Sequence, residues 1–167
     1  SDFSDTQIGL LSSTQLRGFT TSQLNAMDTA QLNLLTAASL STAQIGGLGS
    51  TALNNFTTTQ IGTLDAAQFP AITPLALDSL DTAIFSSLNA TQAGALTSAQ
   101  VAALSTTNFT ALNETTGLPS LAVSSIAGIT TSQIAALSST QANAFTTSQI
   151  GLMNSDQLTA LIIASNA

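Results

Sequence analysis

The chain has 167 residues, a net charge of −7 and only 5% charged residues, against about 25% in typical soluble domains. Its single basic residue, Arg17, argues against binding to nucleic acid or to an anionic membrane surface. The absence of cysteine and histidine excludes disulfides, thiol catalysis and the usual nucleophile–base pairs. No apolar run approaches the roughly 18–20 residues needed to cross a bilayer, so no membrane insertion is expected.

A repeat of eight residues begins at Ser4 and continues to Leu161 in twenty units. Its positions, a to h, read cap residue, two variable residues, glutamine, apolar, variable, small and apolar, as in residues 20–27. All thirteen glutamines occupy position d, and position h is apolar in every unit. A short repeat that runs from end to end indicates a solenoid or an array.

The repeat carries the signals of a short helix. Position a is almost always Ser, Thr, Asp, Asn or Gly, which are the residues that favour a helix N-cap. Glutamine three residues later completes a capping box, in which its side chain returns to the cap N–H. Positions e and h share a helix face, so they can pack against neighbouring coils. We therefore predict an all-α solenoid of short capped helices, one per eight-residue repeat.

Three alternative structures fit the pattern less well. In one continuous helix, each octad would rotate the apolar face by roughly 80°, so no apolar stripe would form. A β-solenoid needs apolar residues two apart, whereas e and h are three apart. A disordered chain would have low hydrophobicity, whereas 44% of this chain is hydrophobic and the large aliphatic residues recur periodically.

The first part of the chain contains one register slip. Residues 4–35 keep the eight-residue register, and residues 36–40 then form a unit of only five residues. The glycine cluster at residues 46–49 follows without the lysine or the preceding strand of a phosphate-binding loop, so we interpret it as a turn.

The middle units, residues 70–85, depart from the pattern. Pro70 lies at position f, where a proline should break the helix, so we expect a shorter or bent unit there. Pro74 follows Thr73 at the first helical position, where the missing N–H of proline is tolerated. Ala76 and Ile84 replace glutamine in this region.

A second slip, at residues 113–121, adds one residue to its unit. Nothing in the chain resembles an interdomain linker, so we predict that residues 1–167 form a single continuous array, with register slips near 36–40 and 113–121. Phe3 already fills a repeat-end apolar position, and no signal peptide or initiator Met is visible. We therefore expect a processed chain or a piece of a longer one.

The acidic residues suit helix capping better than catalysis. Most of them lie in the first three positions of a unit, where negative charge is favoured by the helix N-terminus. The closest acidic pairs are Asp78 with Asp81 and Asp2 with Asp5. Calcium binding at Asp78 and Asp81 is an alternative, although the chain lacks an Asp-rich, Gly-containing calcium loop. We predict no catalytic, cofactor-binding or metal-binding residues, and no enzymatic activity.

The uncharged Ser/Thr-rich faces suggest a second role. A regular hydroxyl array on a rigid scaffold could bind ice or a polysaccharide. Against this, position a exchanges freely among Thr, Ser, Asp, Asn and Gly, as capping allows, and a lattice match would favour one residue type. We keep a binding module for ice or polysaccharide as the alternative function.

Units such as residues 41–48 and 130–137, which read [ST]-T-[AS]-Q-I-x-x-L, resemble the octapeptide-repeat (T-x-x-Q-I-x-x-L) regions of large secreted bacterial surface proteins of the adhesin type. The resemblance covers nearly the whole chain, and it implies an extracellular location and a structural or adhesive role.

These observations predict a structural repeat protein of the bacterial cell surface that forms a fibre, a surface layer or an adhesin stalk. Both ends of the array expose apolar residues, such as Ile162 and Ile163, so we expect head-to-tail stacking into a homopolymer. A surface polysaccharide is a further possible partner, and no cofactor is expected.

Overall fold

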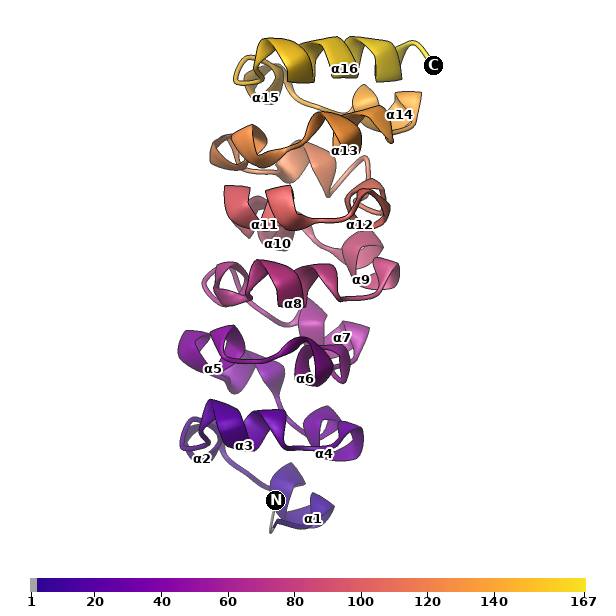
Figure 1. Cartoon of the computed structure of the whole chain (residues 1–167). Coiled ribbons are helices and arrows are strands. Elements are labelled where there is room, and N and C mark those ends of the chain that lie inside the picture. Colours follow the sequence, from indigo (N-terminus) through magenta and orange to yellow (C-terminus); the bar gives the residue numbers. More distant parts are fainter. Residues whose placement is uncertain (1–2) are drawn as a thin grey trace.

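The computed structural model describes residues 3–167, so Asp2 and its predicted pairing with Asp5 lie outside the described residues. Short helices follow one another around a stack of coils that rises from the N-terminus to the C-terminus (Figure 1). Over residues 3–167 the chain forms α-helices and 3-10 helices, and no strand. The predicted all-α solenoid of short helices is confirmed.

The first half of the stack contains α1 (Asp5–Gly9), α2 (Ser13–Leu16), α3 (Thr21–Asn25), α4 (Thr29–Asn33), η1 (Ala37–Ser39), α5 (Thr42–Gly46), α6 (Ser50–Asn54), α7 (Thr58–Gly62), η2 (Phe69–Ala71) and α8 (Pro74–Asp78). The second half contains α9 (Thr82–Ser87), α10 (Ala90–Ala95), α11 (Ser98–Ala103), α12 (Thr106–Thr110), η3 (Leu118–Ser120), η4 (Val123–Gly128), α13 (Thr131–Ala135), α14 (Ser139–Ala142), α15 (Thr147–Ile150) and α16 (Ser155–Ser165).

The capping box starts most of these helices, as predicted. In α13 the Thr130 hydroxyl accepts a hydrogen bond from the Gln133 amide N at 3.1 Å, and Gln133 Oε1 accepts one from the Thr130 amide N at 2.8 Å. Every four-residue α-helix of the array has this box. Helices this short do not persist alone in water, so the caps and the packing between coils must hold them together.

The irregular units form 3-10 turns. The five-residue unit folds as η1, and the unit that contains Pro70 is shortened to η2, as expected from its proline. Pro74 is the first residue of α8, which Thr73 caps. The lengthened unit at 113–121 makes a turn before η3.

The last helix departs from one helix per octad. α16 has eleven residues, because the octad that ends at Leu161 is followed by Ile162 and Ile163 in place of a cap residue. Without a new N-cap the backbone has no signal to end one helix and begin another, and α16 continues across the C-terminal end of the stack (Figure 1).

The side chains at e and h form one apolar core along the stack. Leu24, Phe69 and Phe109 at position e are fully buried. Burial decreases only at the two ends. At the N-terminal end the h residue Phe19 is half-buried, and at the C-terminal end the e residue Leu158 is half-buried.

One turn of the solenoid takes between three and four units. Helices contact the helix three units earlier, as α11 contacts α8 and α16 contacts α13. At these contacts position g of the later unit meets position b of the earlier one. The Ser13 and Ser39 hydroxyl oxygens are 2.9 Å apart, and Thr29 Oγ1 donates to Asn55 Oδ1 at 2.9 Å.

Candidate functional site: the glutamine ladder and the ends of the stack

Each glutamine inside the stack bonds both its own helix and the coil before it. Gln100 Oε1 accepts from the Thr97 amide N at 2.9 Å, which is the capping bond. Its Nε2 donates to the carbonyl oxygens of Phe69 at 3.0 Å and Ile72 at 2.8 Å. These carbonyls belong to positions e and h of the unit four units earlier, so one buried side chain joins two coils.

The same bond to the preceding coil recurs along the chain. In most coils the Nε2 group reaches a carbonyl 28 residues earlier, and we call the set the glutamine ladder. Its members are Gln31, Gln44, Gln60, Gln68, Gln92, Gln100, Gln133, Gln141, Gln149 and Gln157. The carbonyl at position e, such as that of Phe69, also accepts from the backbone N–H at position h. The carbonyl at position h lies past the end of the helix, where backbone partners run out, and the ladder supplies one.

The octad predicts only the capping role of the glutamines, and this second contact was not expected. One signal was available. Glutamate completes a capping box as well as glutamine does, yet no unit has glutamate at position d. A carboxylate accepts hydrogen bonds and cannot donate one, so the exclusive use of glutamine indicates that the donor group is needed.

Where a unit lacks glutamine, a residue at position f of the coil below can replace it. Asn25 Oδ1 accepts from the Gly49 amide N at 2.8 Å, and Asn25 Nδ2 donates to the Gly47 carbonyl at 2.8 Å. Gly49 begins a unit in which Ala52 stands at position d and no side chain caps the helix. Asn25 therefore accepts from below the cap N–H that a glutamine accepts from above, and its amide group joins the two coils.

Asp78 does the same for the unit that begins at Ser105. The asparagine at position d of that unit, Asn108, has a shorter side chain than glutamine. Asp78 Oδ1 instead accepts from the Ser105 amide N at 2.7 Å and from Asn108 Nδ2 at 3.0 Å. Asn108 Nδ2 also donates to the Asp78 carbonyl at 2.7 Å.

We expect Asp78→Ala to lower the unfolding free energy by about 1–2 kcal/mol, because it removes the acceptor of a backbone N–H and of a side-chain amide. Urea unfolding followed by circular dichroism measures the loss. The double variant Asp78→Ala with Asn108→Gln restores a glutamine that can accept from Ser105, so it should recover at least half of the loss. Equal stability of the single and double variants would contradict this explanation.

Aspartates at the N-cap position bond the backbone of their own unit. Asp28 Oδ1 accepts from the Gln31 amide N at 2.9 Å, and Asp81 Oδ1 accepts from the Ala83 amide N at 2.8 Å. Within residues 3–167 no three side chains of the His, Cys, Asp or Glu type gather in a way that could hold a metal ion. Of the suggested calcium pair, Asp78 accepts a hydrogen bond from the coil above, and Asp81 caps its own helix, α9.

The hydroxyls at position a accept hydrogen bonds from the backbone at the start of each capped helix. The Ser12 and Thr57 hydroxyls, for example, each accept from the backbone N–H of the glutamine three residues later. The neighbouring hydroxyls at positions b and c, such as those of Thr58 and Thr59, are exposed. Any hydroxyl surface offered to a ligand therefore consists of the variable positions of the repeat.

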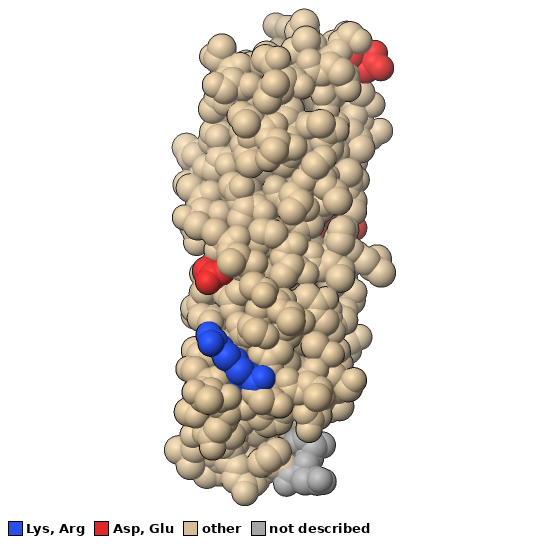
Figure 2. All heavy atoms as spheres, turned by 90° about the vertical axis from the view of Figure 1, so that its left-hand side faces the viewer, with Lys and Arg blue, Asp and Glu red and all other residues tan. Residues whose placement is uncertain are grey.

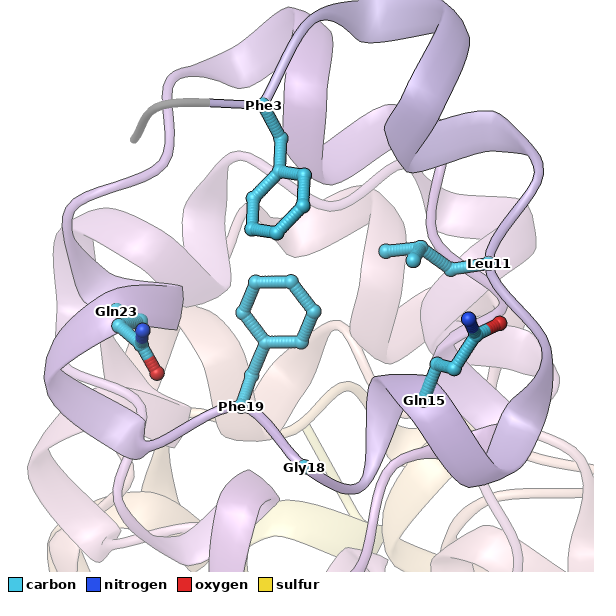
Figure 3. A pocket seen from close by; sticks show the side chains of 6 residues that line it. All are labelled: Phe3, Leu11, Gln15, Gly18, Phe19 and Gln23. Atoms are coloured by element: carbon cyan, nitrogen blue, oxygen red, sulfur yellow. The ribbon is translucent and has the colours of Figure 1, made fainter.

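Two pockets lie at the ends of the stack, each of about 310 Å³. In the N-terminal pocket the rings of Phe3 and Phe19 lie next to each other, tilted by 58°, with centroids 5.7 Å apart, and Gln15 and Gln23 lie on opposite sides of them (Figure 3). The C-terminal pocket is lined by Ala142, Asn143, Ile150, Leu158, Leu161, Ile162 and Ser165. The two pockets thus adjoin the first and the last helices of the described chain.

The sides of the stack carry few charges, and Figure 2 shows one face on which acidic and basic side chains are isolated from one another. Arg17 uses its Nε to donate to the Ser39 carbonyl at 3.1 Å, which links it to the next coil. None of the helices in the described part of the chain is both long and apolar enough to span a membrane.

Comparison with known families supports the repeat. A sequence model of the ALTTAQ repeat matches residues 126–162, which run from the second half of η4 through α13, α14 and α15 into α16. This match supports a repeat region in the C-terminal part of the chain. No curated protein and no solved structure matches the chain.

Proposed function

We propose that this chain is a structural repeat protein of the bacterial cell surface, an element of a fibre, a surface layer or an adhesin stalk, which acts without catalysis. The observation that carries the proposal is the glutamine ladder, which joins coil to coil from Gln31 to Gln157. A rod with one continuous core and regular hydrogen bonds between its coils suits a structural role as a stalk or fibre.

The side-chain chemistry supports the same proposal. With a single basic residue and no histidine or cysteine, the chain has few of the groups that bind phosphates or act as nucleophiles and bases. The most exposed large apolar side chains are Leu10 in the first unit, Leu75 in α8, and Ile162 and Ile163 in the last helix. Apolar ends favour head-to-tail stacking of copies, which gives an open filament when the rotation does not close a ring.

The test is the state of the purified chain as its concentration rises. We expect the mass measured by light scattering to grow with concentration, and negative-stain electron microscopy to show filaments one stack wide. A chain that stays monomeric at millimolar concentration would overturn the filament. Antibody labelling of intact cells of the source organism tests the surface location, and labelling that requires permeabilised cells would overturn it.

The same material tests the alternative of a binding module. Thermal hysteresis measures ice binding, and a glycan array measures polysaccharide binding. The proposed structural role predicts no signal in either assay, because the cap hydroxyls are already hydrogen-bonded within the stack. A strong, saturable signal in one of them would favour the Ser/Thr-rich face as the functional surface.

A further inference from the structure

The glutamine ladder is interrupted at two consecutive units in the middle of the stack. The units at residues 73–80 and 81–88, which form α8 and α9, carry Ala76 and Ile84 at position d. Neither side chain has a group that can donate or accept a hydrogen bond. Because one turn takes between three and four units, two neighbouring units without glutamine leave about half of one turn without ladder bonds to the coil below.

The backbone groups that the two glutamines would bond lack other partners. A ladder glutamine accepts from the cap N–H of its own unit and donates to the carbonyl at position h four units earlier. Here the cap N–H groups belong to Thr73 and Asp81, and the carbonyls belong to Leu48 and Phe56. Within residues 3–167 no hydrogen bond uses any of these four groups. Leu48 and Phe56 are buried, so their carbonyls lose water without gaining a protein donor, which costs free energy.

The replacement from below, which position f supplies elsewhere, does not reach these two units. Below the start of α8 this position holds Gly46, which has no side chain. Below the start of α9 it holds Asn54, whose Nδ2 donates to the Ser79 hydroxyl at 3.1 Å. This bond lies on the exposed surface and satisfies neither a cap N–H nor a carbonyl of the backbone.

Other interruptions of the ladder are single or replaced. Thr116 stands at position d and donates from Oγ1 to the Leu88 carbonyl at 3.5 Å. Ser125, also at position d, bonds only its own unit, but the units on either side of it reach the coil below through Thr116 and Gln133. Among the described units that lie on an earlier coil, only those of α8 and α9 are neighbours that both lack such a bond.

The surroundings of α8 and α9 are well bonded. Upward, Asp78 and the Leu88 carbonyl accept hydrogen bonds from the next coil. In the other half of the same turn, Gln60 and Gln68 donate to carbonyls of the coil below at 2.8 and 2.7 Å. The joint below α8 and α9 is therefore held by the ladder on one side and left without it on the other.

We infer that the stack opens first between α6–α7 and α8–α9, with the side held by Gln60 and Gln68 as the hinge. The helices α8 and α9 pack on α6 and α7 (Figure 1). An array of repeats separates where its interface is weakest, because each coil contacts only its neighbours. Opening this joint breaks no ladder bond and gives water to two buried carbonyls, whereas opening elsewhere breaks glutamine bonds.

The hinge gives the rod one place at which it can bend. The coils on either side of the joint keep their own ladder bonds, so the two parts tilt against each other while each stays folded. Opening is a property of the single chain and does not depend on the proposed function.

Thiol labelling measures the opening, because the chain has no cysteine of its own. Ala76→Cys places a thiol at position d inside the joint. Ala52→Cys is the matched control at the same position, where Asn25 supplies the cap bond and joins the coils. The two alanines are 2% and 3% exposed. We expect iodoacetamide to label the Ala76→Cys variant at least about ten times faster. Equal rates in the two folded variants would overturn the hinge.

Restoring one ladder bond should close the joint. We expect Ile84→Gln, added to Ala76→Cys, to slow labelling about ten-fold, because the new amide can donate to the Phe56 carbonyl and accept from the Asp81 N–H. Ile84→Met has a side chain of similar length without a donor, so it should leave the rate within about two-fold of the parent. Equal rates for the two double variants would show that the missing bond does not control opening, and the hinge would be wrong.

Hydrogen exchange of the unmodified chain gives a readout that needs no substitution. The N–H groups of Leu77 and Val101 both lie at position e, are 0% exposed and donate to the cap carbonyl at 2.9 Å. Val101 follows the ladder residue Gln100, whereas Leu77 follows Ala76. The protection factor of Leu77 should be at least about ten times lower, because short helices exchange once their packing opens. Equal protection at the two positions would overturn the hinge even if the variants failed to fold.

Discussion

Gln133→Glu will lower the unfolding free energy by about 3–5 kcal/mol, whereas Gln15→Glu will change it by less than about 1 kcal/mol. Gln133 is 1% exposed, and its Nε2 donates to the carbonyls of Val101 at 2.8 Å and Leu104 at 2.7 Å. The substitution keeps the size of the side chain and its capping oxygen. It replaces the donor with a buried, charged oxygen that faces two carbonyl oxygens.

The comparison separates the two roles of the glutamine. If position d served only the capping box, glutamate would be an equal substitute, because it caps as well as glutamine does. Gln15 makes the capping bond and is exposed, with no carbonyl partner in an earlier coil, so it is the matched control. Urea unfolding of both variants by circular dichroism measures the difference. Equal effects at the two positions would contradict a role for the ladder in joining coils.

The effect of Gln133→Glu will also depend on pH. Protonation of the introduced carboxyl removes its charge and supplies one hydrogen-bond donor to the carbonyls of Val101 and Leu104. The folded state therefore binds this proton more readily than the unfolded state, and the stability deficit will shrink as the pH falls from 7 toward about 4. If the stability deficit stayed constant over this pH range, the lost stability would come from altered packing around the side chain and not from the missing hydrogen-bond donor.

Gly128→Ala will lower the unfolding free energy by about 2–3 kcal/mol, because it overpacks a contact between coils. A Cβ at Gly128 would overlap the carbonyl oxygen of Ser98, at position b three units earlier. Ser98 begins α11, and its backbone has no room to retreat without moving that helix. The φ angle of Gly128 is not positive, so the backbone conformation does not require glycine there. Glycine is required only because a side chain would not fit.

Gly62→Ala is the matched control for this prediction. Gly62 ends α7, and a Cβ there would meet no other atom within 4 Å. Alanine should therefore stabilise the chain by about 0.5–1 kcal/mol, because it favours the helix and restricts the unfolded chain. Thermal melts of the two variants should shift in opposite directions. A stabilising effect of Gly128→Ala would contradict the close approach of the coils.

The octad predicted the local structure of the chain well, because each signal acts within a few residues. Thr130 and Gln133 specify a helix start by bonding to each other, and Pro70 shortens its unit through its own ring. The apolar residues at e and h were correctly expected to face the core, since a three-residue spacing fixes a helix face wherever the helix points.

The pitch of the solenoid could not be predicted from the octad, and the ladder was missed for the same reason. The angle between one helix and the next depends on how side chains from different coils pack, which an eight-residue pattern does not record. Until the pitch is known, the partner of Gln100 Nε2 at Ile72 cannot be identified. Asn25 and Asp78 were missed because position f appears variable along the sequence, and their roles exist only against Gly49 and Ser105 of the next coil.

Hydrogen exchange of the glutamine side-chain amides, measured by NMR at a concentration where the chain is monomeric, tests the ladder most directly. The Nε2 protons from Gln44 to Gln157 should exchange at least about ten times more slowly than those of Gln7, Gln15 and Gln23, because only the former bond a carbonyl inside the stack. Uniformly fast exchange at all thirteen glutamines would show that the coils are not joined through these side chains.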